Sequence, residues 1–545
     1  MPDQVWVLGL DGATWTLLQP WIDAGALPTL AYLQKNGAWG PLRSSLQFLT
    51  PVAWTTFLTG LNPGKHGIFD FTRRTPGSYQ PTLVNAASRT GRSLWRILSD
   101  ANKRVGVVNV PMTYPPEPVN GFLVSGLDTP GLNARYTWPA AFKEKVQDLH
   151  FIAVGTIGKS HQRYLQETLA GVDKRFALFR RTQTMTPLDF YMGVVMETDA
   201  IQHCSWHLLS RPEHPQHDAI LQVYQRIDAH LAEMLARMPD DVTLIIMSDH
   251  GAGPIARIIY LDRWLARQGW LHWRSGHGRQ TLQRGAQRAF HLAQRFLPAG
   301  VKGRLKRFSR TQAAMDALLT QSAIDWPRTA AYTAGNLGAI NLNIRGRDPE
   351  GVLAPEQVDE FIDALTQALH ALRDPETGQP MVARVMRRQE VYTGPMLARA
   401  PDLLIRWVDD KYLAVKDYDA DPHGPVFGDR LKFGRHGAAY ALDQTGTHVM
   451  DGIVLMFGRN VRSGVHLSRA NLLDLAPTIL HLLSVPIPKN MDGSPLLGAF
   501  TAKIAQKRVI FDENSPKTPF FDENLTLDEQ KQLRERLQSL GYIAD

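Results

Sequence analysis

The chain has 545 residues, of which 44% are hydrophobic and 21% are charged, so it predicts a large folded protein with more than one structural unit. No apolar run approaches the about eighteen residues that cross a bilayer, which argues against a membrane-spanning helix. No basic segment precedes the first apolar run, and the single cysteine, Cys204, cannot form an intrachain disulfide. We therefore expect a cytoplasmic protein.

Short apolar runs and helical patterns alternate along the chain. The runs that predict strands are Val5–Leu10, Val105–Val110, Phe190–Met196, Thr243–Met247, Leu403–Trp407 and Ile453–Phe457. Helical patterns occur at Pro28–Gly37, at Ser93–Ala101 and in the tail at Thr526–Tyr542. Alternation of this kind predicts an α/β fold with a mostly parallel central sheet.

The stretch Thr50 to Phe71 begins with a threonine and a proline, continues as an apolar helical run, and reaches a turn at Asn62-Pro63-Gly64. A threonine at the start of a helix is explained structurally as a cap of free backbone N–H groups. It also suits a nucleophile, because a phosphoryl group bound there meets those N–H groups and the helix dipole. Gly60 to Lys65 is one residue too short for a phosphate-binding P-loop, and His66 stands where Ser or Thr is needed.

Three of the predicted strands end in an acidic residue, namely Asp11, Asp199 and Asp249. Asp199 lies four residues before His203, which places both on one side of a helical turn, and His250 follows Asp249 directly. Each of these residues alone is explained by a turn or a solvated surface. Because the carboxyl ends of parallel strands share one edge of a sheet, the set together with Thr50 suits two divalent cations.

The positive net charge of +8 is concentrated in one segment. Twelve Lys or Arg and no Asp or Glu lie between Arg263 and Met315, and without these twelve the chain has 48 basic and 52 acidic residues. Apolar residues from Leu282 to Leu297 recur there at helical spacing. Residues 263–310 fit three roles: a basic helix on an anionic membrane, an ordinary packed helix with a solvated face, or nucleic-acid binding. Nucleic acid is the least favoured role, because the segment contains no recognised module.

The sequence resembles the alkaline phosphatase superfamily and, within it, the type I phosphodiesterase/nucleotide pyrophosphatase-like group of phosphohydrolases. Eight segments carry the resemblance in the family's order: LGLDG at 8–12, TGLNPGKHGIFDF at 59–71, VNVPMTYPP at 108–116, ETDAIQH at 197–203, MSDHG at 247–251, APDLLI at 400–405, GTHVMDGI at 446–453 and LAPTILHLL at 475–483. The resemblance implies a three-layer α/β sandwich with an inserted cap. We predict a catalytic core formed by residues 1–255 and 400–500, a cap at 256–399, and a tail helix within 501–545.

The resemblance also implies seven ligands for two divalent metals, which we expect to be zinc, with manganese as the alternative. The first metal would be held by Asp199, His203 and His448. The second would be held by Asp11, Asp249, His250 and the Thr50 oxygen. His436 competes with His448, which we favour because it follows the family's Gly-Thr-His pattern and leads into an apolar strand. The family gives His66 no ligand role, so we interpret it as structural.

The implied activity is metal-dependent hydrolysis of phosphate mono- or diesters of small molecules, with Thr50 as the nucleophile that becomes phosphorylated. Thr50-Pro51-Val52-Ala53-Trp54 lacks the Cys or Ser setting of the sulfatases. The alternatives are a phosphomutase or phosphotransferase of the same superfamily, or a non-catalytic protein that docks on a membrane or nucleic acid through the basic segment. The substrate, the metal and the oligomeric state stay open.

Overall fold

The computed structural model describes residues 4–153, 155, 159–274, 324–416, 424–428, 431–432, 442–513 and 525–539. A ten-stranded sheet lies at its centre, and one strand, β23, pairs with β2 beside the main path. The order along that path is β22 (Val465–His466), β2 (Ala38–Arg43), β21 (Asp451–Phe457), β9 (Val242–Met247), β1 (Gln4–Leu10), β8 (Phe190–Val195), β5 (Val105–Val110), β6 (Gly121–Ser125) and β7 (Thr137–Trp138).

The middle of this sheet is parallel. Strands β9, β1, β8, β5 and β6 all run in the same direction, and Val5 of β1 lies between Phe190 of β8 and Thr243 of β9. Every residue of β5, β8 and β9 is buried, which explains why these strands appear in the sequence as continuous apolar runs. The antiparallel strand β21 pairs with β9 on one side and β2 on the other. The prediction of a mostly parallel central sheet is confirmed.

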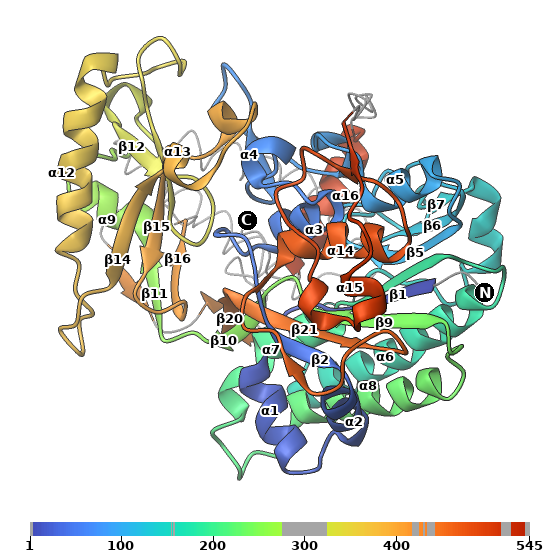
Figure 1. Cartoon of the computed structure of the whole chain (residues 1–545). Helices are drawn as coiled ribbons and strands as arrows, with labels where there is room; N and C mark the ends of the chain where they lie inside the picture. The colour runs from blue at the N-terminus through green and yellow to red at the C-terminus, as the bar shows by residue number, and fades with distance from the viewer. Residues whose placement is uncertain are drawn as a thin grey trace, which may run out of the picture.

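Helices cover both faces of the sheet and form two hydrophobic cores, so the architecture has three layers (Figure 1). One face is covered by α1 (Trp15–Asp23), α2 (Pro28–Asn36), α6 (His161–Gln183), α7 (Glu197–Ser205) and α8 (Ala219–Leu235). The other face is covered by α3 (Thr50–Thr59), α5 (Leu94–Asp100), α14 (Leu475–Leu482), α15 (Ala502–Ala505) and α16 (Leu527–Ser539). The predicted three-layer α/β sandwich is therefore the observed fold.

The end of α3 differs in one respect from the prediction. The helix stops at Gly60, whose φ of 65° is a conformation that glycine adopts readily. The expected turn at Asn62-Pro63-Gly64 is instead the start of a short helix, α4 (Pro63–His66). The reason is local, because the Asn62 side chain caps the Gly64 N–H and Pro63 occupies the first helical position.

A second group of elements lies beside the sandwich, at the left of Figure 1. It contains one sheet of β12 (Ala331–Thr333), β13 (Ala339–Leu342), β15 (Leu403–Trp407) and β14 (Val382–Arg387), a smaller sheet of β16 (Tyr412–Val415), β11 (Arg257–Tyr260) and β17 (Phe427–Gly428), and helices α9 (Leu261–Arg267) and α12 (Val358–His370). These elements enclose their own hydrophobic core. The predicted strand Leu403–Trp407 is present, but it pairs with β13 and β14 because Leu403, Ile405 and Trp407 pack into that core. The sheet of β12, β13, β15 and β14 therefore continues past residue 399, where the predicted cap ends. The domain boundaries at the other positions stay predictions.

A hairpin links the two groups directly after the Thr50 stretch. It consists of β3 (Thr72–Arg74) and β4 (Pro81–Leu83). At its tip, Tyr79 stacks on Trp326 with ring centroids 3.7 Å apart, and the Tyr79 hydroxyl donates to Asn343. Arg74 forms an ion pair with Asp348 at 2.7 Å. The segment that carries α3 is therefore anchored to the second group of elements, which is the smaller unit of the structure.

The basic segment is described only at its beginning. Arg263 donates to the Pro425 carbonyl and Arg267 to the Gly424 carbonyl, so these two arginines belong to the internal contacts of the smaller unit. Residues 275–323, with the predicted basic helix from Leu282 to Leu297, lie outside the described residues. Within the described part of the chain, no helix has the length and apolar character needed to span a membrane. Membrane contact through residues 263–310 stays a prediction.

Candidate active site

Six of the seven predicted ligands follow strands of the central sheet or lie in a strand beside it. Asp11 comes directly after β1, Asp249 and His250 after β9, and α7, which carries Asp199 and His203, starts just beyond β8. His448 lies in β20 (Gly446–Val449), which pairs with β10 (Gly251–Pro254) and places His448 opposite Ala252. The seventh residue, Thr50, begins α3. The fold thus brings residues separated by up to 437 positions to one edge of the sheet.

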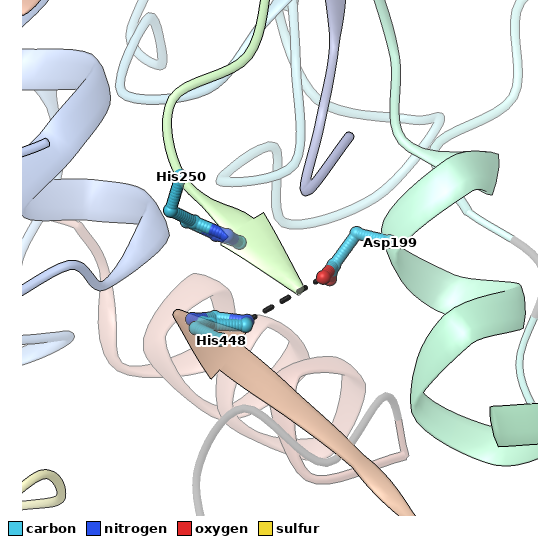
Figure 2. A group of neighbouring side chains, drawn as sticks. All are labelled: Asp199, His250 and His448. Carbon is cyan, nitrogen blue, oxygen red and sulfur yellow. Dashed lines mark ion pairs between the residues drawn. The ribbon is translucent and has the colours of Figure 1, made fainter. Parts of the chain in front are cut away.

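One cluster contains Asp199, His203 and His448. The two oxygens of Asp199 lie 3.2 Å from His203 Nε2 and 3.4 Å from His448 Nε2, and the two histidine Nε2 atoms are 3.0 Å apart. Figure 2 shows the Asp199 carboxylate facing His448, with the ring of His250 beside it. The rings of His250 and His448 stack with centroids 3.6 Å apart.

A second cluster surrounds His250. Its Nε2 lies 3.3 Å from Asp249 Oδ2, 3.6 Å from Asp11 Oδ1 and 3.5 Å from Thr50 Oγ1. Groups able to hold a cation are Asp11 with Asp249 and His250, and also Asp199 with His250 and His448. The sequence assigned His250 to one metal, whereas in the structure it borders both clusters.

The capping explanation of Thr50 does not hold. The residue at the cap position of α3 is Leu49, whose side chain forms no capping hydrogen bond, and Thr50 is the first residue inside the helix. Its side chain is fully buried and its oxygen faces His250. The hydroxyl therefore lies among the predicted ligands, as a nucleophile in that position requires.

The three histidines share one orientation. The Nδ1 atoms of His203, His250 and His448 lie 3.0, 3.0 and 3.1 Å from the backbone carbonyls of Gly446, Gly251 and Phe48. Because a carbonyl only accepts, the Nδ1 atoms of His250 and His448 carry a hydrogen, and in the neutral rings Nε2 is the atom that can bind a cation. His203 Nδ1 also lies 3.0 Å from the amide nitrogen of Gln444. Carbonyl partners of this kind fix the tautomer and the ring of metal-ligating histidines.

Burial makes the charges of the site unfavourable in the absence of a counterion. Burial, together with the charges of Asp249 and Asp199, raises the pKa of Asp11 well above its ordinary value. Burial and the charge of Asp199 raise the pKa of Asp249 in the same way. Burial also acts to raise the pKa of Asp199, but His203 and His448 outweigh it and hold that pKa well below its ordinary value. Clustered buried carboxylates are the electrostatic setting that a bound cation relieves.

The donor set fits divalent cations. Asp11 Oδ1 and Asp249 Oδ2 are buried and accept no hydrogen bond from the described residues. The Nε2 atoms of His203 and His448 face each other at 3.0 Å, beside the Asp199 carboxylate. Mixed imidazole and carboxylate ligands of this kind are typical of zinc sites.

Three further residues of the sequence analysis, Trp54, His66 and His436, were expected to lie outside the ligand set or to compete with it. Trp54, which the sequence presented only as an apolar helix residue, donates its indole N–H to Asp11 Oδ2 at 2.8 Å. His66 contacts Thr56 and the Ile68 N–H, and burial together with Arg89 lowers its pKa to about 3, so it is a neutral structural residue. The competing ligand His436 lies outside the described residues.

Comparison with known proteins agrees with this fold. The sequence profile of the type I phosphodiesterase/nucleotide pyrophosphatase family matches residues 5–439. Phosphonoacetate hydrolase from Sinorhizobium meliloti, solved with phosphonoformate, is similar in structure with a TM-score of 0.54 at 14% identity, over 89% of this chain and 95% of that one. At this identity the likeness shows the fold alone.

Two other solved structures are more distant in shape. Murine ectonucleotide pyrophosphatase/phosphodiesterase 5 gives a TM-score of 0.47 at 15% identity, over 89% of this chain and 95% of that one. The human protein of the same name gives 0.47 at 14%, over 91% and 98%. No curated protein sequence matches the chain significantly. Because the family profile covers most of the chain, the protein belongs to the type I phosphodiesterase/nucleotide pyrophosphatase family and is a hydrolase that acts on phosphoester bonds.

Proposed function

We propose that the protein hydrolyses phosphate mono- or diesters of small molecules in two steps, through a phospho-threonine on Thr50. The proposal includes two divalent cations, zinc or manganese. Asp199, His203 and His448 would hold one cation, and Asp11, Asp249, His250 and the Thr50 oxygen would hold the other. The observation that supports it best is the 3.5 Å approach of Thr50 Oγ1 to His250 Nε2, inside the cluster that also contains Asp11 and Asp249.

In the first step, the Thr50 oxygen attacks phosphorus, the Oγ1–P bond forms, and the bond from phosphorus to the leaving alcohol breaks. Thr50 loses its hydroxyl proton and the leaving oxygen gains one. In the second step, water attacks phosphorus from the side opposite Oγ1, which releases phosphate or a phosphomonoester and restores the threonine. When bound, the cations would neutralise charge on the phosphoryl oxygens and lower the pKa of the attacking groups.

The residues of the chain position the reacting groups and set the electrostatic field around the phosphoryl group. Thr50 is the first residue of α3, so it lies at the positive end of the helix dipole, where a phosphoryl group is favoured. The site residues are buried, which strengthens each electrostatic interaction with a phosphoryl group. Transfer of the phosphoryl group to an acceptor alcohol shares the first step, and a phosphotransferase is therefore the second candidate.

The proposal is tested with bis(p-nitrophenyl) phosphate and p-nitrophenyl phosphate as substrates, and with elemental analysis of the bound metal. Thr50→Ala should abolish hydrolysis and leave the metal content nearly intact. Thr59→Ala is the matched control, because Thr59 is buried in the same helix and its hydroxyl bonds, among the described residues, to the Thr55 carbonyl and the Leu61 N–H of the backbone. It should keep its activity. Full activity of Thr50→Ala, or of enzyme stripped of metal, would contradict the proposal.

A further inference from the structure

Trp54 lies one helical turn after Thr50 and contacts the other side of the candidate site. Residues four apart share a face of a helix, so Thr50 and Trp54 both point from α3 toward the end of β1. The Trp54 indole N–H donates to Asp11 Oδ2 at 2.8 Å, and both side chains are fully buried. An indole N–H is a donor only, so the direction of this hydrogen bond is fixed.

The indole ring has little freedom to leave this position. A Cβ atom added at Gly9 would lie 2.6 Å from Trp54 Cη2, which shows that the ring lies directly against the backbone of β1, two residues before Asp11. On another side, Phe57 meets the ring edge to face, with centroids 5.9 Å apart. The ring is thus held between the strand that ends in Asp11 and its own helix.

Because of this hydrogen bond, the two carboxylate oxygens of Asp11 have different surroundings. Oδ2 accepts the indole hydrogen, while Oδ1 lies 3.6 Å from His250 Nε2 and accepts no hydrogen bond from the described residues. The backbone of Asp11 is fixed as well, because its N–H donates to the Val195 carbonyl and its own carbonyl accepts from the Thr198 hydroxyl. Only the rotation of the carboxylate is left for Trp54 to set.

We propose that Trp54 is a positioning residue of the metal site formed by Asp11, Asp249 and His250. Its N–H holds the Asp11 carboxylate so that Oδ1 alone faces the cation. Because Thr50 and Trp54 occupy successive turns of α3, the same helix sets the nucleophile and this ligand relative to each other. The inference rests on the proposed function, since it requires a cation at this cluster.

The test compares variants that remove the donor at position 54 with a matched variant elsewhere. Trp54→Phe removes the N–H, and replacement of Trp54 by benzothienylalanine removes it while the bicyclic shape is kept. Trp95→Phe is the control, because Trp95 is also fully buried in a helix and donates its indole N–H to a carboxylate, Glu117 Oε1, at 2.6 Å. Zn²⁺ and Co²⁺ are titrated into the metal-free full chain by calorimetry, and the Co²⁺ absorption spectrum is recorded.

Both Trp54 variants should weaken one of the two cation sites about 10- to 100-fold and alter its Co²⁺ spectrum, as expected when an outer partner of a ligand is lost. The other site should keep its affinity within about twofold, and Trp95→Phe should keep both. If the wild-type chain binds two cations and hydrolyses phosphate esters while the benzothienylalanine variant retains both affinities, the positioning role is overturned and the proposed function stands. If the wild-type chain binds no cation, the proposed function fails together with this inference.

Discussion

Gly12 offers a sharp test of how closely the two halves of the site approach each other. It follows Asp11 with a φ of 67°, its N–H donates to Asp249 Oδ1 at 3.3 Å, and its carbonyl accepts from Gln202. A Cβ atom at this position would lie 2.9 Å from Asp199 Oδ1 and 3.2 Å from Gln202 Nε2. Gly12→Ala therefore perturbs Asp199 of one cluster from the turn that carries Asp11 of the other.

Backbone strain and displacement of Asp199 should both act in the Gly12→Ala variant. Alanine in a left-handed backbone conformation costs about 1–2 kcal/mol of folding free energy. In addition, Asp199 must move by a few tenths of an ångström, because real Cβ atoms do not approach a neighbour as closely as 2.9 Å. Since misplacement by about 1 Å costs on the order of 100-fold in rate, we expect kcat/KM to fall roughly 10-fold or more.

Gly25→Ala separates the two effects. Gly25 has a similar φ of 74°, but an added Cβ atom meets nothing within 4 Å. In thermal unfolding, Gly25→Ala should lose only the cost of the backbone conformation, about 1–2 kcal/mol, and Gly12→Ala should lose at least as much. Only Gly12→Ala should lose phosphodiesterase activity and cation affinity. If the two variants retain equal kcat/KM and equal cation affinity, Asp199 does not lie against Gly12 as described.

Three further predictions concern the framework of the site. Arg175→Met should lower the free energy of unfolding, measured with urea, by about 3–5 kcal/mol, because it leaves the buried Glu197 without its 3.0 Å ion pair. Adding Glu197→Met should restore much of the lost stability. A double variant no more stable than the single one would contradict this. Burial raises the pKa of Asp70 from 3.8 to about 7, so the folded state favours the protonated carboxyl group. The stability that the protonated carboxyl contributes is fully present below pH 3.8 and is lost as the pH rises to about 7. Asp70→Asn should gain stability over the wild type across that interval, and a difference independent of pH would refute the assignment. Leu533→Ala should lower the stability of the docked α16 by about 2–5 kcal/mol, because Leu533 is fully buried; unchanged hydrogen exchange in α16 would argue against that docking.

Part of the candidate site could be predicted from the sequence because several of its predicted ligands follow strands, whereas His448 was assigned only through the family resemblance. Asp11 and Asp249 each come directly after an apolar run, and Asp199 and His203 have the spacing of one helical turn. The order of parallel strands brings such residues together whatever their distance along the chain. Pattern and position were therefore enough to predict that these residues meet.

Other features depend on tertiary contacts that no local pattern contains. The run Leu403–Trp407 predicts a strand, but its sheet is decided by which core its side chains enter. Trp54 is apolar by composition, and its role follows from one N–H that the fold directs at Asp11. Its spacing of four residues from Thr50 is the signal that was available, since it places both side chains on one helix face.

The covalent step at Thr50 is open to direct observation. Full-length enzyme mixed with excess bis(p-nitrophenyl) phosphate is quenched in acid within the first turnover, digested, and analysed by mass spectrometry. The account predicts that the peptide containing Thr50 carries one phosphoryl-ester adduct, that fragmentation places it on Thr50, and that it decays when substrate is exhausted. Steady hydrolysis with no adduct on Thr50 at any quench time, or an adduct on another residue that forms and decays at the rate of turnover, would contradict it.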